Sequence, residues 1–201
     1  KILAANEIEK DISTAYSLNH PHVKMLNQDI CDLTEDTLST ALDGQKVDLI
    51  IGGPPCQSYS TLGKRQMDGR ARLFLEYKRI LEILRPRAFV FENLVGLLSM
   101  DHGRLFRRIT EEFAALGYDL RHQVLDAADF GVPQHRERVI LVGFRGRNPF
   151  RYPAPTHGEG LLPHVPLRDA IGDLPVLKSG QSAENYAHDA DNDYLEFVRS
   201  G

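Results

Sequence analysis

The sequence has few cysteines, no long apolar run and no excess of positive charge. Only two of its 201 residues are cysteine, Cys31 and Cys56, which excludes a scaffold held together by several disulfides. No apolar stretch approaches the length of a membrane span and no secretory signal peptide is visible, so we expect no membrane association. The formal net charge of -4 argues, on totals alone, against a nucleic-acid binder, but the distribution of charge matters more than its sum.

The remaining composition, 42% hydrophobic and 26% charged, is that of one soluble globular domain. Short apolar runs alternate with segments of helical periodicity, which is typical of an α/β fold with a doubly wound, mostly parallel sheet. A closely linked final pair of strands predicts one antiparallel strand at an edge. The predicted strands cover residues 2–5, 23–26, 47–51, 88–91, 118–125 and 139–142, and the predicted helices cover residues 8–19, 34–43, 73–84 and 103–116.

Cys56 follows an apolar run, residues 47–51, that ends in Gly-Gly-Pro-Pro. We interpret the run as a buried parallel strand, which the glycines and prolines end in a stiff turn. The thiol then lies just past the carboxyl end of a strand, where open α/β sheets bind their ligands. Most free cysteines are small buried hydrophobic residues, and we interpret Cys31 in that way. A cysteine buried for packing needs no such rigid platform, so Cys56 is a candidate nucleophile.

The next apolar strand, residues 88–91, leads directly into Glu92 and Asn93. Alone, this carboxylate is weak evidence, because it can simply cap the following turn. Beside a nucleophilic thiol at a neighbouring strand end, a partly desolvated carboxyl group can give or share a proton near neutral pH.

A third segment, Gln-His-Arg-Glu-Arg at residues 134–138, precedes the last predicted strand. Strand alternation would place Gln134, Arg136 and Arg138 on one face, and His135 and Glu137 on the other. The first face would offer a row of donors suited to carbonyl and phosphate oxygens. Standing alone, the segment would be interpreted as a solvated edge strand.

Two acids end short apolar stretches near the N-terminus: Glu7, before Ile8, and Asp29, before Ile30. In a doubly wound sheet, an acid after the second strand typically holds a ribose hydroxyl. Either acid alone is nonspecific.

Taken together, these segments resemble the C5-cytosine DNA methyltransferases. Pro-Pro-Cys-Gln at 54–57, Glu-Asn at 92–93 and Gln-x-Arg-x-Arg at 134–138 occur in the family's order, and segments 68–74, 85–89 and 165–175 add looser matches. The resemblance implies a Rossmann-like methyltransferase fold that uses S-adenosylmethionine and no metal. His157 and His164, far apart and without cysteine partners, would make a poor metal site.

The resemblance also implies how the catalytic residues act. Cys56 would add to carbon 6 of a flipped cytosine, which makes carbon 5 an enamine-like nucleophile. Glu92 would hydrogen-bond or protonate ring nitrogen 3. Arg138 would bind the cytosine carbonyl oxygen, and Arg136 would support the same pocket. The residues expected to contact the substrate are Gln57, Ser60, Asn93 and Gln134, with Asn93 bracing Glu92 and the Cys56 loop; for Ser60, a plain turn hydroxyl is equally consistent.

The cofactor residues follow in the same way. Glu7 would bind the ribose of S-adenosylmethionine while Ile8 packs on its adenine, and Asp29 would accept from the exocyclic amine beside Ile30. Pro55 and Leu73 would line the methionine end.

The chain departs from the family in lacking the Phe-x-Gly-x-Gly-Gly loop and a recognisable target-recognition region. We therefore expect a catalytic core that belongs to a longer enzyme and that binds cofactor weakly by itself. The expected division is a catalytic core at 1–148, incomplete at its N-terminus, and a proline-rich linker at 149–201 leading toward a target-recognition region.

The expected activity is that of a DNA (cytosine-5-)-methyltransferase acting on double-stranded DNA in the cytoplasm. The expected enzyme is a monomer, with a cognate restriction endonuclease as its possible partner. Two alternatives stay open: a tRNA cytosine-5 methyltransferase of the same superfamily, and a non-catalytic binding subunit that kept the fold.

Overall fold

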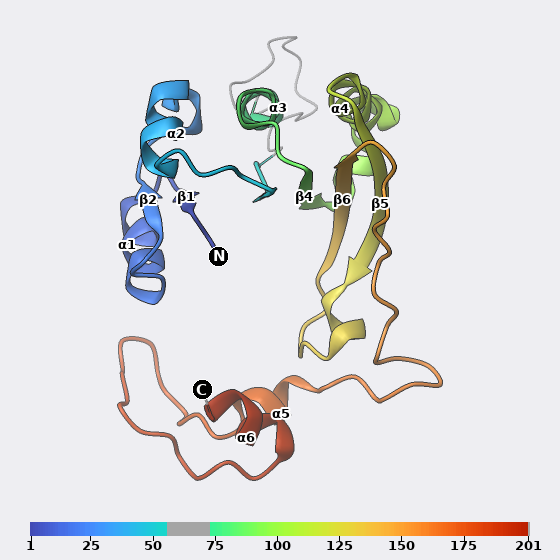
Figure 1. Ribbon diagram of the computed structural model, residues 1–201. Coiled ribbons are helices and arrows are strands. Elements are labelled where there is room, and N and C mark those ends of the chain that lie inside the picture. Colours follow the sequence, from blue (N-terminus) through green and yellow to red (C-terminus); the bar gives the residue numbers. More distant parts are fainter. Residues whose placement is uncertain (56–72, 201) are drawn as a thin grey trace. The chain divides into compact units, whose positions relative to one another are not determined.

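The computed structural model describes residues 1–55 and 73–200 (Figure 1). It divides into unit 1, Lys1–Gln123 with Val139–Arg151, and unit 2, Val124–Arg138 with Tyr152–Gly201. The elements are β1 (Ala4–Asn6), α1 (Lys10–Asn19), β2 (Lys24–Leu26), η1 (Ile30–Asp32), α2 (Glu35–Leu42), β3 (Leu49–Gly52), α3 (Leu73–Leu84), β4 (Ala88–Leu94), η3 (Val95–Leu98), η4 (Met100–Gly103), α4 (Arg104–Ala115), β5 (Tyr118–Asp126), η5 (Ala127–Phe130), β6 (Glu137–Arg145), α5 (Leu167–Ile171) and α6 (Asp193–Arg199).

The strands form two hydrogen-bonded groups, β1-β2 and β3-β4-β6-β5. β1 pairs with β2, and β3 with β4, in parallel register. β6 runs antiparallel to its neighbours, since the amide of Arg145 at its end donates to Arg87 just before β4. At the other end of β6, the carbonyl of Arg136 accepts from Ala127, which follows β5. The predicted antiparallel last strand is therefore confirmed, but it lies between β4 and β5 rather than at the edge.

The main core of unit 1 joins α3 and α4 to β4 and β6. Its largest fully buried side chains include Phe74, Phe89, Phe91 and Phe113. The rings of Phe89 and Phe113 meet edge to face at 5.0 Å, a favourable geometry for aromatic pairs. The apolar stripe predicted for residues 73–84 is this core face of α3, because apolar side chains three and four residues apart share one side of a helix.

A second cluster attaches the β1-β2 segment to α3. Leu33, Leu38 and Ile80 are buried there, with Leu26 and Ile30 packed against them. Thr34 begins α2 as predicted, because its hydroxyl accepts the amide of Thr37 at 3.1 Å. The cluster packs the end of β2 and the following η1 segment against the helix that follows the segment containing Cys56.

β3 is less buried than its sequence predicts. Ile50 packs into both clusters, whereas Leu49 and Ile51 on the opposite face are 48% and 71% exposed. The prediction of a strand buried on both faces is wrong for the described residues, where β3 is an edge strand and pairs with β4 alone. Cys31 is likewise exposed, not packed in the core as expected.

Unit 2 contains the two short helices α5 and α6. Its α6 begins at Asn192, whose side chain accepts the amide of Leu195 at 3.0 Å. Asp173, 1% exposed, forms two hydrogen bonds with the guanidinium group of Arg199. Residues 124–138 belong to this unit, so it also contains the turn between β5 and β6.

Candidate active site

Glu92 and the glycines before Cys56 meet where β3 and β4 end. The register pairs Gly52 with Phe91, so Gly53 lies beside Glu92. A Cβ atom added to Gly53 would lie 2.8 Å from Oε2 of Glu92, so the end of the Glu92 side chain would have to move. Glycine lets the chain pass against the carboxylate without displacing it.

Asn93 fastens the same turn from the other side. Its side chain is 6% exposed, and its Nδ2 donates to the carbonyl of Pro54 at 2.9 Å. Its Oδ1 accepts the amide of Leu94 at 3.0 Å, so both ends of the buried amide are bonded. This contact ties the chain two residues before Cys56 to the end of β4.

Three predicted site residues, Cys56, Gln57 and Ser60, lie outside the described residues. The flanking predicted residues are described: Pro55 is exposed, and Leu73 is the half-buried first residue of α3.

Tyr77 of α3, which sequence reasoning missed, packs under the turn. Its hydroxyl donates to the carbonyl of Val90 at 2.9 Å and lies 3.3 Å from the carbonyl of Ile50. Its ring is so close to Gly52 that an added Cβ would lie 2.6 Å from it. Burial raises the pKa of Tyr77, so the group stays a neutral donor bridging β3 and β4. The available signal was a tyrosine in an apolar helix stripe, since a buried hydroxyl needs a partner.

The predicted cofactor residues come together at the ends of β1 and β2. These strands are parallel and pair Asn6 with Leu26, so Glu7 and Asp29 both follow at the same sheet edge. Oε1 of Glu7 accepts the amide of Glu9 at 2.9 Å, and Oδ1 of Asp29 accepts that of Cys31 at 2.9 Å. The bond from the Cys31 amide lowers the pKa of Asp29, which keeps this carboxyl group ionised at neutral pH.

The residues present fit a nucleoside. Two carboxylates can accept from ribose hydroxyls and an amine, and each keeps acceptor capacity beyond its backbone bond. Ile8 is 57% exposed and offers an apolar surface next to Glu7, while Ile30 packs on the α3 side. Partial desolvation and the Asp29 carboxylate raise the pKa of the Cys31 thiol to about 11. Cys31 is therefore a poorer candidate nucleophile than Cys56.

Arg79 of α3 holds this edge in place and was also missed from the sequence. Its guanidinium group donates to the carbonyls of Leu33 at 2.6 Å and Ile30 at 2.8 Å. Glu76, one turn earlier, accepts from its Nε at 2.7 Å. The backbone that carries Ile30 is thus tied to the helix that begins at Leu73.

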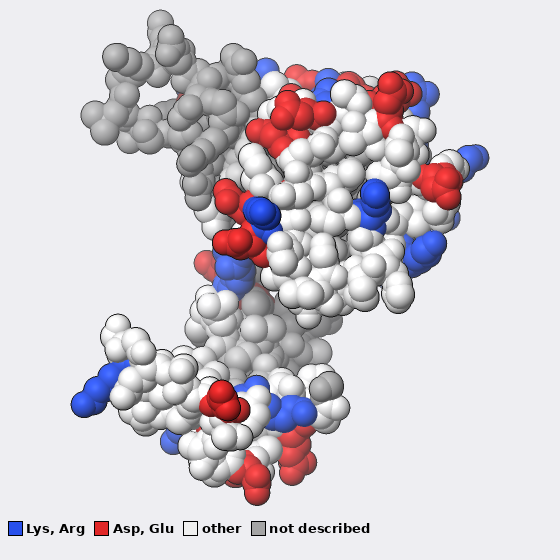
Figure 2. Space-filling model, turned by 90° about the vertical axis from the view of Figure 1, so that its left-hand side faces the viewer, with Lys and Arg blue, Asp and Glu red and all other residues white. Residues whose placement is uncertain are grey.

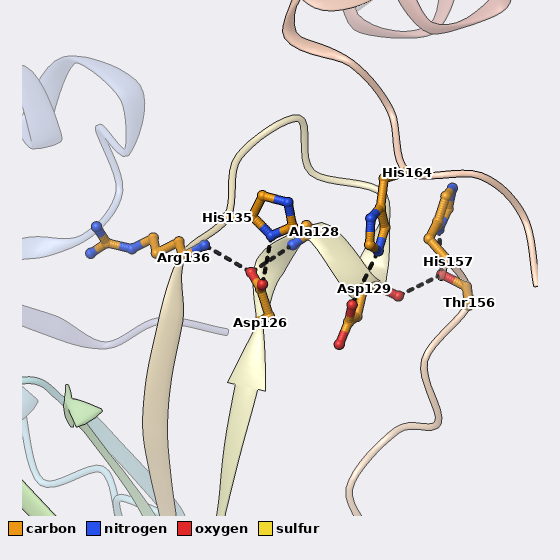
Figure 3. A network of polar contacts seen from close by, with 8 residues as sticks. All are labelled: Asp126, Ala128, Asp129, His135, Arg136, Thr156, His157 and His164. Atoms are coloured by element: carbon orange, nitrogen blue, oxygen red, sulfur yellow. Dashed lines mark hydrogen bonds and ion pairs between the residues drawn. The ribbon is translucent and has the colours of Figure 1, made fainter. Parts of the chain in front are cut away.

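The arginine motif lies in unit 2 and differs in part from its prediction. β6 begins at Glu137, so the strand alternation expected from Gln134 onward is wrong for the first residues. Gln134 lies in a turn, where its amide donates to the carbonyl of Val132 at 2.7 Å, because Pro133 interrupts the strand pattern. Arg136 and His135 do extend in opposite directions, as Figure 3 shows. Arg138 is half-buried, and its Nη1 donates to the carbonyl of Glu137 at 2.8 Å.

Charges of both signs lie side by side on the face drawn in Figure 2. Within residues 1–55 and 73–200, no group of three or more histidine, cysteine or acidic side chains could hold a metal ion. Over the same residues, no helix is both long and apolar enough to cross a bilayer.

Comparison with known proteins identifies the family to which the chain belongs. A family model described as C-5 cytosine-specific DNA methylase matches residues 1–198. The chain belongs to this family. It is 36% identical over 209 residues to the Type II methyltransferase M1.HphI of Haemophilus parahaemolyticus, covering 99% of this chain and 55% of that protein. It is 38% identical over 204 residues to the Type II methyltransferase M.DdeI of Desulfomicrobium norvegicum, covering 96% of this chain and 49% of that protein.

A solved structure shares the fold. A prophage-encoded protein of E. coli, described as a DNA modification methyltransferase, superposes with a TM-score of 0.77 at 21% identity. The match covers 98% of this chain and 57% of the other. The predicted Rossmann-like methyltransferase fold is confirmed. The chain spans about half the length of M1.HphI and of M.DdeI.

Proposed function

We propose that this chain is the catalytic core of an S-adenosylmethionine-dependent DNA (cytosine-5-)-methyltransferase that acts through a covalent Cys56 adduct. The observation that carries the proposal is the joined end of β3 and β4. There Gly53 passes against the Glu92 carboxylate, and Asn93 holds the carbonyl of Pro54 at 2.9 Å. Membership of the family supports only the type of reaction. The contacts of Gly53 and Asn93 support, in addition, a turn that presents residue 56 near the Glu92 carboxyl group.

In the proposed reaction, the sulfur of Cys56 bonds to carbon 6 of a cytosine rotated out of the duplex. The carbon 5–carbon 6 electron pair becomes available at carbon 5, and Glu92 donates a proton or hydrogen bond to nitrogen 3 to take up the developing charge. Arg138 binds the carbonyl oxygen and Arg136 supports the pocket. Once carbon 5 carries the transferred methyl group, loss of its proton restores the carbon 5–carbon 6 double bond and expels the thiolate.

S-adenosylmethionine would supply the electrophilic methyl group. The residues that would hold it are Glu7, Ile8, Asp29 and Ile30, with Pro55 and Leu73 toward the methionine end. Two ionisable acids and two isoleucines at one edge suit a ribose and an adenine, which supports this assignment.

The substrate and assembly are proposed as well. The relatives M1.HphI and M.DdeI are named Type II methyltransferases. These names support double-stranded DNA as the substrate and a restriction endonuclease as the partner. We further propose a monomer that works in the reducing cytoplasm, where a catalytic thiolate persists.

The test is trapping on duplex DNA that contains 5-fluorocytosine. The full-length protein, incubated with S-adenosylmethionine, should form a denaturation-resistant protein–DNA adduct, since fluorine cannot leave carbon 5 as a proton does. Cys56→Ser should form none, and Glu92→Gln should form it slower by at least about tenfold, the scale of general acid catalysis. Methyl transfer to tRNA but not to duplex DNA would contradict the DNA substrate. Absence of an adduct on either nucleic acid would indicate a non-catalytic subunit.

A further inference from the structure

Asp126, at the end of β5, collects three hydrogen bonds in the turn that leads to the arginine motif (Figure 3). Its Oδ1 accepts the amide of Arg136 at 2.8 Å and that of Ala128 at 3.1 Å. Its Oδ2 contacts Nδ1 of His135 at 2.8 Å. The side chain is only 19% exposed, so these groups take the place of water around the carboxylate.

A second layer connects this turn to residues 156–164. Oδ1 of Asp129 contacts Nε2 of His164 at 3.2 Å, and the carbonyl of Asp129 accepts the amides of Thr156 and His157 at 2.9 and 3.0 Å. The rings of His135 and His164 meet at right angles, 5.5 Å apart. The two aspartate–histidine pairs therefore lie side by side between the turn and the proline-rich segment (Figure 3).

We propose that Asp126 is a positioning residue for Arg136, and that it forms with His135, His164 and Asp129 a proton-sensitive clasp on the arginine-bearing turn. The proposal rests on the proposed function, because it matters for catalysis only if Arg136 supports the cytosine pocket. Its physical basis is direct: the carboxylate holds the backbone amide of Arg136, while the side chain of Arg136 points away from the clasp.

The charges make the clasp sensitive to pH. The hydrogen bond and charge of Asp126 raise the pKa of His135, with smaller contributions from Asp129 and Glu137. The bond from His135, followed by that from the Arg136 amide, lowers the pKa of Asp126 to about 2. The acidic residues that act on His135 are thus Asp126 on β5, Asp129 on η5 and Glu137 on β6, and the His164 ring of the proline-rich segment lies against it.

The sign of the effect follows from these shifts. A raised pKa of His135 means that its contribution is complete below the ordinary value of 6.5 and is lost as pH rises through the folded-state value. A lowered pKa of Asp126 means that its contribution is complete above 3.8 and is lost as pH falls toward 2. The clasp should hold Arg136 most firmly in mildly acidic solution and loosen on the alkaline side.

The first experiment measures the clasp without any enzymatic activity. Histidine titration by NMR should place the midpoint of His135 above its ordinary value, and Asp126→Asn should return it toward that value. Asn keeps an acceptor for the Arg136 amide, while it removes both the charge and the Oδ2 acceptor that contacts His135. Asp126→Ala should speed hydrogen exchange of the Arg136 amide by about tenfold or more, as expected for a lost bond to a charged group. Asp169→Asn, which removes an acid of α5 outside this turn, is the control and should leave the exchange rate unchanged.

The second experiment uses the full-length enzyme. Asp126→Ala should lower kcat for cytosine methylation by at least about tenfold at an unchanged KM for S-adenosylmethionine, because none of the proposed cofactor residues belongs to the turn that Asp126 holds. Asp126→Asn should shift the alkaline limb of the rate–pH profile toward lower pH. If the wild-type enzyme methylates no cytosine, the proposed function fails, but the NMR and exchange measurements still test the clasp. The clasp proposal would be overturned by an unchanged titration midpoint of His135 in Asp126→Asn, or by an unchanged exchange rate of the Arg136 amide in Asp126→Ala.

Discussion

The side-chain amide of Asn93 donates to the carbonyl oxygen of Pro54 at 2.9 Å, which joins the end of β4 to the turn after β3. The contact spans 39 positions of sequence and is half-buried. It makes the position of the residues that follow Pro54 depend on the residue beside Glu92.

Asn93→Ala should therefore lower the free energy of unfolding by about 1–3 kcal/mol, because the hydrogen bond from Asn93 to the Pro54 carbonyl is lost and a small cavity opens. Denaturant titration measures the change. The neighbouring Leu94→Ala is the control: Leu94 is 52% exposed, and its truncation should cost less than half as much. Equal losses in the two variants would show that the Asn93 bond contributes nothing of its own. In the full-length enzyme, Asn93→Ala should also slow the formation of the 5-fluorocytosine adduct.

Gly53→Ala should move the Glu92 carboxylate, because the new Cβ would lie 2.8 Å from Oε2. Gly96→Ala is a matched control, since a Cβ there meets nothing within 4 Å. We expect adduct formation in the full-length enzyme to fall at least about tenfold for Gly53→Ala and to stay within a factor of two for Gly96→Ala, on the scale of misplaced catalytic groups. If the two variants react at the same rate, the close approach of residue 53 to Glu92 has no catalytic role.

Cofactor binding tests the β1-β2 edge. Asp29→Asn should weaken binding of S-adenosylmethionine by about tenfold or more, the loss expected when a hydrogen bond to a charged group disappears. The asparagine oxygen can still accept the Cys31 amide, so the turn should persist. Glu9→Gln alters an exposed acid two residues after Glu7 and should leave the affinity unchanged. Calorimetric titration gives the dissociation constants. A wild-type affinity in Asp29→Asn would remove Asp29 from the site.

Local sequence signals predicted the elements well, because periodicity and caps act over a few residues. The α3 stripe and the Thr34 cap are examples. The predictions that failed concern how deeply a strand is buried and where it begins. The exposure of Leu49 and Ile51 depends on which strands and helices flank β3, and a strand's own sequence does not contain that information.

The candidate site follows the same division. The sequence motifs identified Glu92 and Asn93, which the structure brings to the turn before Cys56. Tyr77, Arg79 and Asp126 were missed because their importance comes from backbone groups elsewhere in the chain. Arg79, for example, reaches carbonyls 46 and 49 positions away. No spacing rule identifies such partners before the chain has folded.

The two faces of β3 differ enough to be tested by one substitution on each. Ile50→Ala should destabilise the protein by about 2 kcal/mol or more, since Ile50 packs into both apolar clusters. Ile51→Ala removes the same atoms from a side chain that is 71% exposed, and should change the free energy of unfolding by no more than about 0.5 kcal/mol. Denaturant titration of both variants gives the comparison. A loss at Ile51 as large as that at Ile50 would mean that the outer face of β3 is covered in solution.

The buried pair in unit 2 should make the α5 and α6 segments sensitive to acid. Hydrogen bonds from Arg199 lower the pKa of Asp173, so the pair's contribution is complete above the ordinary value of 3.8 and is lost as pH falls below it. The protection of amides 167–199 against hydrogen exchange, relative to the unfolded chain at the same pH, should accordingly fall as pH drops below 3.8. Arg199→Met should have low protection both above and below that pH, because the carboxylate has lost its partner.

Arg168→Met is the control for this pair. Arg168 is 89% exposed and lies 3.8 Å from Asp169, so its ion pair is solvated and worth little. The Arg168→Met variant should therefore respond to acid as the wild-type protein does. Were Arg199→Met to keep that response too, some other carboxylate would have to control the opening of this segment, and the Asp173–Arg199 pair would be only one of several contacts between α5 and α6.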